Sequence, residues 1–171
     1  MSQTWFWTKS VARERRDHLG EFASFHGGFA VEERKEPGLF ARRFPVATGL
    51  HRGRPVEIGF GPDGYNTRRT ASATHTVLSI ADVLVPAGLR VFPSLRGGFT
   101  AKGGARGAAS AWMAHGTRAG LLEEWRARHG YVSLSDALGL RVHVAGVSLP
   151  PPALVSRLDE AIDLMEALER A

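Results

Sequence analysis

Residues 75–93, HTVLSIADVLVPAGLRVFP, form the most apolar run of the chain. β-Branched and aliphatic residues dominate both halves of this run, and such residues fit the pleated surface of a buried strand. Pro86-Ala87-Gly88 separates the halves, and proline and glycine are typical turn residues. The run therefore predicts two buried strands, Thr76 to Val85 and Leu89 to Phe92, joined by a turn.

The residues before this run predict further strands of an antiparallel meander. Val56, Ile58 and Phe60 alternate with Glu57 and Gly59, a pattern typical of a strand with one buried and one solvated face. Other expected strands are Phe29 to Val31, Leu39 to Phe44 and Val46 to Leu50. Tyr65 to Ala73 is expected to begin one long twisted strand that continues into Thr76 to Val85. We expect Pro45 to separate Leu39 to Phe44 from Val46 to Leu50, because proline has no N–H to donate to a strand ladder. His51 to Arg54 and Gly61 to Gly64 are the expected hairpin turns.

The composition changes after Pro93. The stretch from Arg96 to Gly107, RGGFTAKGGARG, is rich in glycine and predicts a loop. Ala108 to His115 and Thr117 to His129 predict helices, and Tyr131 to Leu134 is either a strand or an irregular connection. Alternation over Leu140 to Val144, followed by Val147 to Leu149, predicts a short hairpin.

Helical periodicity appears at both ends of the chain. Residues 8–25 place apolar side chains at three- and four-residue spacing. Residues 153–170 follow three prolines and carry an apolar stripe of Leu154, Leu158, Ile162, Met165 and Leu168. We predict one α+β domain over residues 1–171, with an antiparallel sheet of about five to seven strands, two or three packed helices, and the C-terminal helix covering the sheet.

Composition narrows the class of protein. The chain has 171 residues, no cysteine and no apolar run long enough for a transmembrane helix. Its N-terminal region has only a three-residue aromatic block before charged residues begin, which is too short for a secretory leader. We therefore expect a cytoplasmic protein without disulfides or thiolate metal sites.

Positive charge is concentrated in the middle of the chain. The formal net charge is +5, and residues 37–110 hold ten cations against three anions. A basic surface of this kind binds nucleic acid or an acidic membrane surface, whereas the alternative is a solvated face without a partner. The candidate anion-binding side chains are Arg42, Arg43, Arg52, Arg54, Arg68, Arg69, Arg96, Lys102 and Arg106.

The N-terminus carries a second candidate surface. Trp5, Phe6 and Trp7 are too hydrophobic to remain stably in water. They either fold back onto the core or form a docking tail, residues 1–7, for a partner or a membrane surface.

Motifs for catalysis, cofactors and metals are missing from the sequence. The glycine-rich segment lacks the Gly-Lys-Ser/Thr ending of a phosphate-binding loop, and no serine lies in a G-x-S-x-G motif. The histidines form no metal motif, and we expect surface or structural roles for His18, His26, His51, His75, His115, His129 and His143. Asp82 is the one charge in the strand predicted over Thr76 to Val85. It either lies buried beside an arginine or marks a strand end, a bulge or the solvated face.

Two phrases of the sequence carry a resemblance. The chain resembles bacterial α+β domains with no assigned activity. The resemblance rests on HRGRPVEI (residues 51–58) and PAGLRV (residues 86–91), together with an N-terminal helix, a basic meander and a terminal amphipathic helix. The resemblance implies a bacterial source and an α+β fold, and it transfers no site residue.

The functional prediction is a non-enzymatic interaction, scaffold or assembly protein whose partner is another protein or a second copy of the chain. The alternative is a protein that binds an anionic partner through residues 37–110. An enzyme has no motif to support it.

Overall fold

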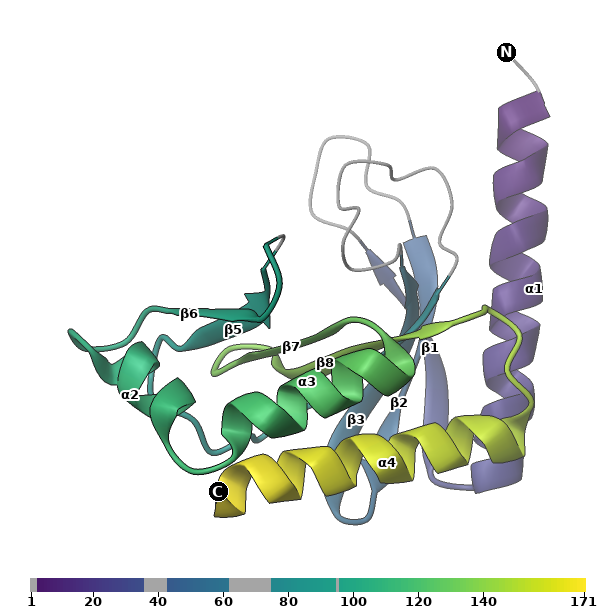
Figure 1. Ribbon diagram of the computed structural model, residues 1–171. Helices are drawn as coiled ribbons and strands as arrows, with labels where there is room; N and C mark the ends of the chain where they lie inside the picture. Colours follow the sequence, from purple (N-terminus) through teal and green to yellow (C-terminus); the bar gives the residue numbers. More distant parts are fainter. Residues whose placement is uncertain (1–2, 36–42, 62–74, 95) are drawn as a thin grey trace.

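The computed structural model describes residues 3–35, 43–61, 75–94 and 96–171. The described chain forms four helices and eight strands (Figure 1). In chain order they are α1 (Gln3–His26), β1 (Phe29–Lys35), β2 (Arg43–His51), β3 (Arg54–Gly61), β4 (His75–Ile80), β5 (Arg90–Pro93), β6 (Phe99–Lys102), α2 (Ala108–Ala114), α3 (Arg118–His129), β7 (Val132–Ser135), β8 (Gly139–Ala145) and α4 (Pro151–Arg170).

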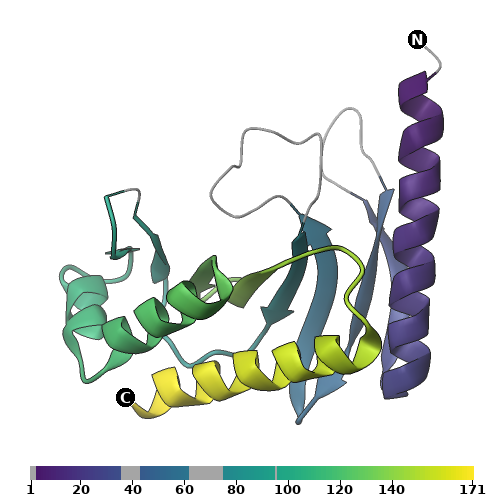
Figure 2. The same cartoon turned by 45° about the vertical axis from the view of Figure 1, so that its right-hand side comes forward.

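The eight strands form one antiparallel sheet in the order β1-β2-β3-β4-β8-β7-β5-β6. All four helices contribute buried side chains to a single core with one face of this sheet, and α3 lies beside α4 (Figure 1 and Figure 2). The other face carries no helix of the described chain, and we call it the helix-free face. The predicted α+β class is confirmed, with more strands and helices than expected.

Alternation along the central strands assigns each side chain to one of the two faces. In β3, Val56 and Ile58 are buried on the helix side, while Glu57 between them lies on the helix-free face. In β8, Leu140 and Val142 are buried and Arg141 between them is only partly so. The predicted period of two is therefore observed, and it positions the polar residues discussed below.

Residues 75–93 were predicted to form two strands that pair with each other across a turn, and this pairing is wrong. β4 ends at Ile80, and residues 81–89 form an irregular segment that we call the Asp82 loop. β4 pairs with β3 and β8, whereas β5 pairs with β6 and β7. The physical reason is that Asp82 turns the chain away with a φ of 59°, while β8 offers β4 a matching row of apolar residues.

The predicted hairpin over residues 140–149 is also wrong. β8 pairs with β7 on one side and β4 on the other, and residues 146–150 lead irregularly into α4. In the glycine-rich segment, residues 99–102 form β6 instead of a loop. Glycines with positive φ stand just before and just after this strand, so the glycine clusters serve its two turns.

Pro45 does not interrupt β2 as predicted. It lies opposite Glu33 of β1, beyond the point where the β2–β3 ladder ends at Ala47 and Ile58. Its missing N–H therefore removes no bond of the β2–β3 ladder. The predicted turn at the other end of β2 is confirmed, since Arg52 and Gly53 both have positive φ (50° and 77°), as a tight two-residue hairpin turn requires.

The end helices are longer than predicted. α1 begins at Gln3, so Trp5, Phe6 and Trp7 are helical; their side chains lie outside the described residues. α4 buries the predicted apolar stripe against β4 and β8. Each fully buried leucine of that stripe contributes about 1.5–3 kcal/mol. None of the helices in the described ranges combines the length and apolar character needed to cross a bilayer.

Candidate binding pocket on the helix-free sheet face

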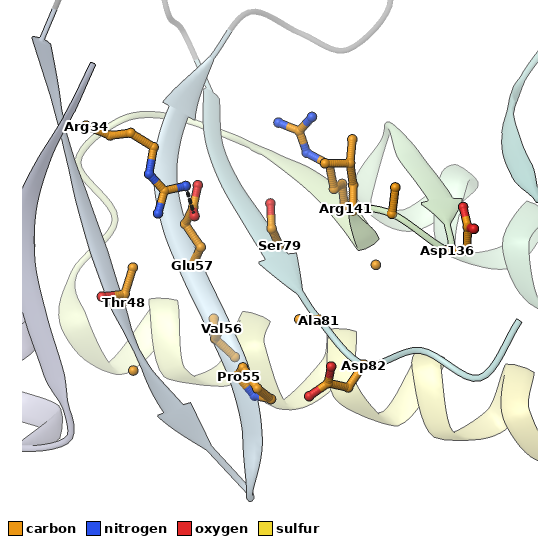
Figure 3. A pocket seen from close by; sticks show the side chains of 14 residues that line it. Arg34, Thr48, Pro55, Val56, Glu57, Ser79, Ala81, Asp82, Asp136 and Arg141 are labelled. Atoms are coloured by element: carbon orange, nitrogen blue, oxygen red, sulfur yellow. Dashed lines mark hydrogen bonds and ion pairs between the residues drawn. The ribbon is translucent and has the colours of Figure 1, made fainter. Parts of the chain in front are cut away.

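A row of polar side chains crosses the helix-free face. The strand registers place Thr48 of β2 opposite Glu57 of β3, Glu57 opposite Ser79 of β4, and Ser79 opposite Arg141 of β8. Neighbouring strands lie about 5 Å apart, so these four side chains are consecutive neighbours. They form the floor of a pocket (Figure 3).

The pocket is an open hollow of about 540 Å³. One wall is the start of the Asp82 loop, and the other is the turn between β7 and β8, residues 136–138, together with Gly139 at the start of β8. The volume lies within the range of about 300–1,000 Å³ that is typical of small-molecule sites. In Figure 3, Arg34 and Glu57 lie on one side of the hollow and Asp136 on the other, with Arg141 and Asp82 toward different ends.

Arg141 has no partner among the described residues. Its Nε atom is buried without a hydrogen bond, and no described acid lies within ion-pair distance of its guanidinium. A buried donor left without an acceptor costs about 1–3 kcal/mol. Arg34, across the pocket, differs because it is paired with both Glu57 and Glu32.

Asp82 is held firmly although its carboxylate is free. Arg54 Nη1 donates to the Asp82 carbonyl oxygen at 3.0 Å, and Arg54 Nη2 donates to Glu169 at 2.8 Å. The second oxygen of Glu169 accepts the Leu84 N–H at 3.1 Å. The exposed Asp82 carboxylate itself has no hydrogen-bond or ion-pair partner within the described ranges. Asp82 thus marks the strand end, one of the two predicted alternatives.

Asp136 serves the fold instead of the pocket. Its Oδ2 atom accepts the N–H of Gly88 at 2.6 Å, and its own N–H donates to the carbonyl of Leu89. The residue thereby fixes the far end of the Asp82 loop against the β7–β8 turn. Arg141 and Asp82 remain as the two charged pocket side chains without a described partner.

The predicted anion-binding arginines of the β2–β3 turn contact acids of α4. Arg52 Nη1 lies 2.6 Å from Asp163, and Arg52 Nη2 lies 3.3 Å from Glu166. Arg54 is paired with Glu169. Their charge is therefore compensated within the protein.

The other predicted cations are dispersed. Arg96, Lys102 and Arg106 are exposed around β6, and Lys102 Nζ lies 5.6 Å from the centre of the Phe92 ring. Arg42, Arg68 and Arg69 lie outside the described residues, as does the side chain of Arg43. The remaining predicted cations with described side chains therefore do not form one basic surface with Arg52 and Arg54.

Three residues far apart in the sequence form a hydrogen-bonded chain at the end of the sheet. His26 Nε2 lies 2.7 Å from His51 Nδ1, and His51 Nε2 lies 2.8 Å from Asp159 Oδ1. We call this chain the His–His–Asp relay. Asp159 accepts from His51 Nε2–H, so His51 Nδ1 is left to accept from His26 Nε2–H.

Burial lowers the pKa of His26, His51 lowers it further, and Asp159 opposes them. Within the described residues, no three histidine or acidic groups are arranged to hold a metal ion.

The sequence predicted neither this relay nor the unpaired position of Arg141, because both depend on which distant segments become neighbours. The alternation around Arg141 predicted only that it lies on the solvated face.

No family model, curated protein or solved structure matches this chain.

Proposed function

We propose that this protein is a non-enzymatic binding protein whose ligand or partner presents an anionic group to Arg141. The observation that carries the proposal is the Arg141 guanidinium, which borders a pocket of about 540 Å³ and has no described partner for its buried Nε–H. A bound carboxylate or phosphate supplies the missing acceptor.

The chemistry of the floor supports an anion. Guanidinium groups bind carboxylate and phosphate through two parallel hydrogen bonds, and such charge-assisted bonds are about twice as strong as neutral ones. Ser79, directly opposite Arg141 in the register, adds a hydroxyl donor next to it. Glu57, the nearest acid of the row, is already neutralised by Arg34.

The lining favours binding over catalysis. Its described residues include no histidine, cysteine, lysine or tyrosine, the side chains that most often act as nucleophile or general base beside a carboxylate. Its remaining polar groups are hydroxyls, carboxylates and arginines.

A titration with inorganic phosphate and with acetate, followed by NMR shifts of backbone amides in β4 and β8, tests the proposal. We expect Arg141→Gln to weaken binding about tenfold or more, since a hydrogen bond to a charged group contributes about 1.5–3 kcal/mol. Arg170→Gln, an exposed site at the end of α4, is the matched control and retains the wild-type affinity. Equal affinities of the wild type and Arg141→Gln overturn the proposal.

A second candidate is binding of a polyanion, nucleic acid or an acidic membrane, on the outer strands. The observation that favours it is the pairing of Arg90 directly opposite Lys102, two exposed cations with no acidic partner among the described residues. Like charges directly opposite each other destabilise a strand pair unless an anion lies between them. Arg96 and Arg106 add exposed charge in the neighbouring turns.

A further inference from the structure

We infer that the pocket accepts a zwitterionic ligand, a short peptide with free ends, whose carboxylate binds Arg141 and whose ammonium group binds Asp82. The Arg141 half of this inference rests on the function proposed above. The Asp82 half is new, and it names the class of ligand.

Two charged side chains that line the pocket have no partner in the described ranges. Its lining holds five charged side chains: Arg34, Glu57, Asp82, Asp136 and Arg141. Arg34 and Glu57 neutralise each other, and Asp136 accepts the Gly88 N–H. The two that remain have opposite signs, yet they form no ion pair with each other. A ligand with one charge of each sign satisfies both.

The position of Asp82 is fixed before any ligand binds. Its φ of 59° lies in the left-handed region, which costs roughly 1 kcal/mol for most residues and is better tolerated by aspartate. Arg54 and Glu169, whose side chains are 26% and 12% exposed, hold the loop on both sides of Asp82. Binding a cation there needs little ordering of the protein, and reduced ordering cost increases affinity.

The spacing of the two charges selects the length of the ligand. Ser79 is directly opposite Arg141, and Asp82 follows three residues later along the chain. Three residues of chain span at most about 10 Å, and the paired strands are about 5 Å apart, so the Cα atoms of Asp82 and Arg141 are at most on the order of 10–15 Å apart. An extended peptide spans about 3.3–3.6 Å per residue, so two to four residues bridge the gap. A single α-amino acid, whose charges are adjacent, is too short.

The surface between the two charges suits a peptide backbone. Ser79 and Thr48 provide hydroxyls on the floor, while Ala81, Ala137 and Leu138 provide apolar walls. Leu138 is 59% exposed at the rim, so it is free to contact an apolar side chain of the ligand.

Trialanine, N-acetyl-trialanine and trialanine amide form the probe set, titrated into the full chain and followed by NMR shifts of β4 and β8 amides. Asp82→Asn is the main variant, because asparagine also adopts positive φ and preserves the loop. Asp17→Asn, at an exposed site on α1, is its matched control. Arg141→Gln reports on the other end of the ligand.

We expect trialanine to bind the wild type and Asp17→Asn equally, and Asp82→Asn about tenfold more weakly. N-acetyl-trialanine should bind the wild type and Asp82→Asn alike, because it has no ammonium group. Trialanine amide should be insensitive to Arg141→Gln for the corresponding reason.

The inference is overturned if trialanine does not bind at millimolar concentration, or if neither acetylation nor Asp82→Asn changes its affinity. In both cases the Arg141 site for phosphate or acetate survives independently when Arg141→Gln still weakens those anions. Loss of the Arg141 effect on every probe overturns both proposals together.

Discussion

At the scale of single residues, Gly139 shows how closely the pocket wall approaches the core strand. It opens β8 with a φ of 70°, and a Cβ built on it would lie 1.9 Å from the carbonyl oxygen of Ile80. Backbone atoms of β4 are fixed by two ladders and have no room to move aside. Only glycine fits here, for reasons of both conformation and space.

We expect Gly139→Ala to lower the free energy of unfolding by about 2–4 kcal/mol, through the unfavourable φ and the backbone clash. Urea denaturation followed by circular dichroism measures the change. Gly20→Ala is the matched control, because Gly20 is in the interior of α1 and, apart from the backbone of that helix, no atom lies within 4 Å of the place its new methyl group would take. The control should raise stability by up to about 1 kcal/mol. A Gly139→Ala protein as stable as the wild type would contradict this account.

At the scale of elements, the Arg54–Glu169 pair joins β3, the Asp82 loop and α4. Glu169 accepts from Arg54 with one oxygen and from the Leu84 N–H with the other. Glu169→Ala removes both acceptors, so we expect hydrogen exchange at the Leu84 amide to accelerate by about tenfold or more. Exchange measured by NMR on the native protein reports this change directly. Glu166→Ala, which removes an acid paired with Arg52 instead, should leave the Leu84 amide protected.

The His–His–Asp relay joins α1, β2 and α4 in a similar way. The pKa of His26 is lowered from its ordinary value of 6.5, first by burial and then by His51, against the opposing charge of Asp159. The unfolded chain therefore binds a proton at a higher pH than the folded protein does. Stability is present above pH 6.5 and is lost as the pH falls through that value toward the lower folded pKa. Burial lowers the pKa of His129 as well, which adds a dependence of the same sign.

We expect the melting temperature of the wild type to fall between pH 7.5 and pH 5.5, and the fall to be smaller in His26→Gln. Glutamine keeps a side-chain N–H donor for His51 and removes the titrating ring. His115→Gln, at an exposed position, is the control and should keep the wild-type pH dependence. Differential scanning fluorimetry across this pH range measures it. Identical pH profiles for the wild type and His26→Gln would refute the assignment.

Elements with strong local periodicity were predictable from the sequence, and their partners were not. The stripe of α4 and the alternation of Val56 and Ile58 are written in neighbouring residues, so both predictions are confirmed. The pairing of Leu78 with Val142 depends on a contact between distant segments. The same distance separates Arg54 from Glu169 and His51 from Asp159, which is why neither contact had a signal in the spacing of the sequence.

At the scale of the whole molecule, the sequence predicted where the positive charges lie along the chain. It did not predict which acids neutralise them in the folded protein. Arg52 and Arg54 contributed to the predicted basic surface, yet α4 supplies acids to both. Arg141, outside the predicted basic region, is the arginine of the pocket with no described partner. The candidate site was therefore missed because a count of charges along the chain does not reveal which charges meet in space.

The exposed cations of the outer strands make a prediction for polyanions. We expect single-stranded oligonucleotides to bind weakly at low salt, with the double variant Arg90→Gln, Lys102→Gln lowering the slope of log affinity against log salt by about 1–1.5. Arg128→Gln, on α3 and paired with Glu124, is a control of the same kind of charge change and should keep the slope. A flat electrophoretic-shift titration for the wild type rules out this candidate.

The position of β8 between β4 and β7 has a consequence during synthesis on the ribosome. β4 emerges with β3 already available on one side, but its other neighbour follows only after roughly 60 more residues. Because synthesis adds about 5–20 residues per second, the N–H and C=O groups of that strand edge remain unpaired for several seconds. An apolar edge left open is a template for association with other nascent chains. β8, the last strand to be synthesised, thus covers the edge of β4 at which nascent chains could associate.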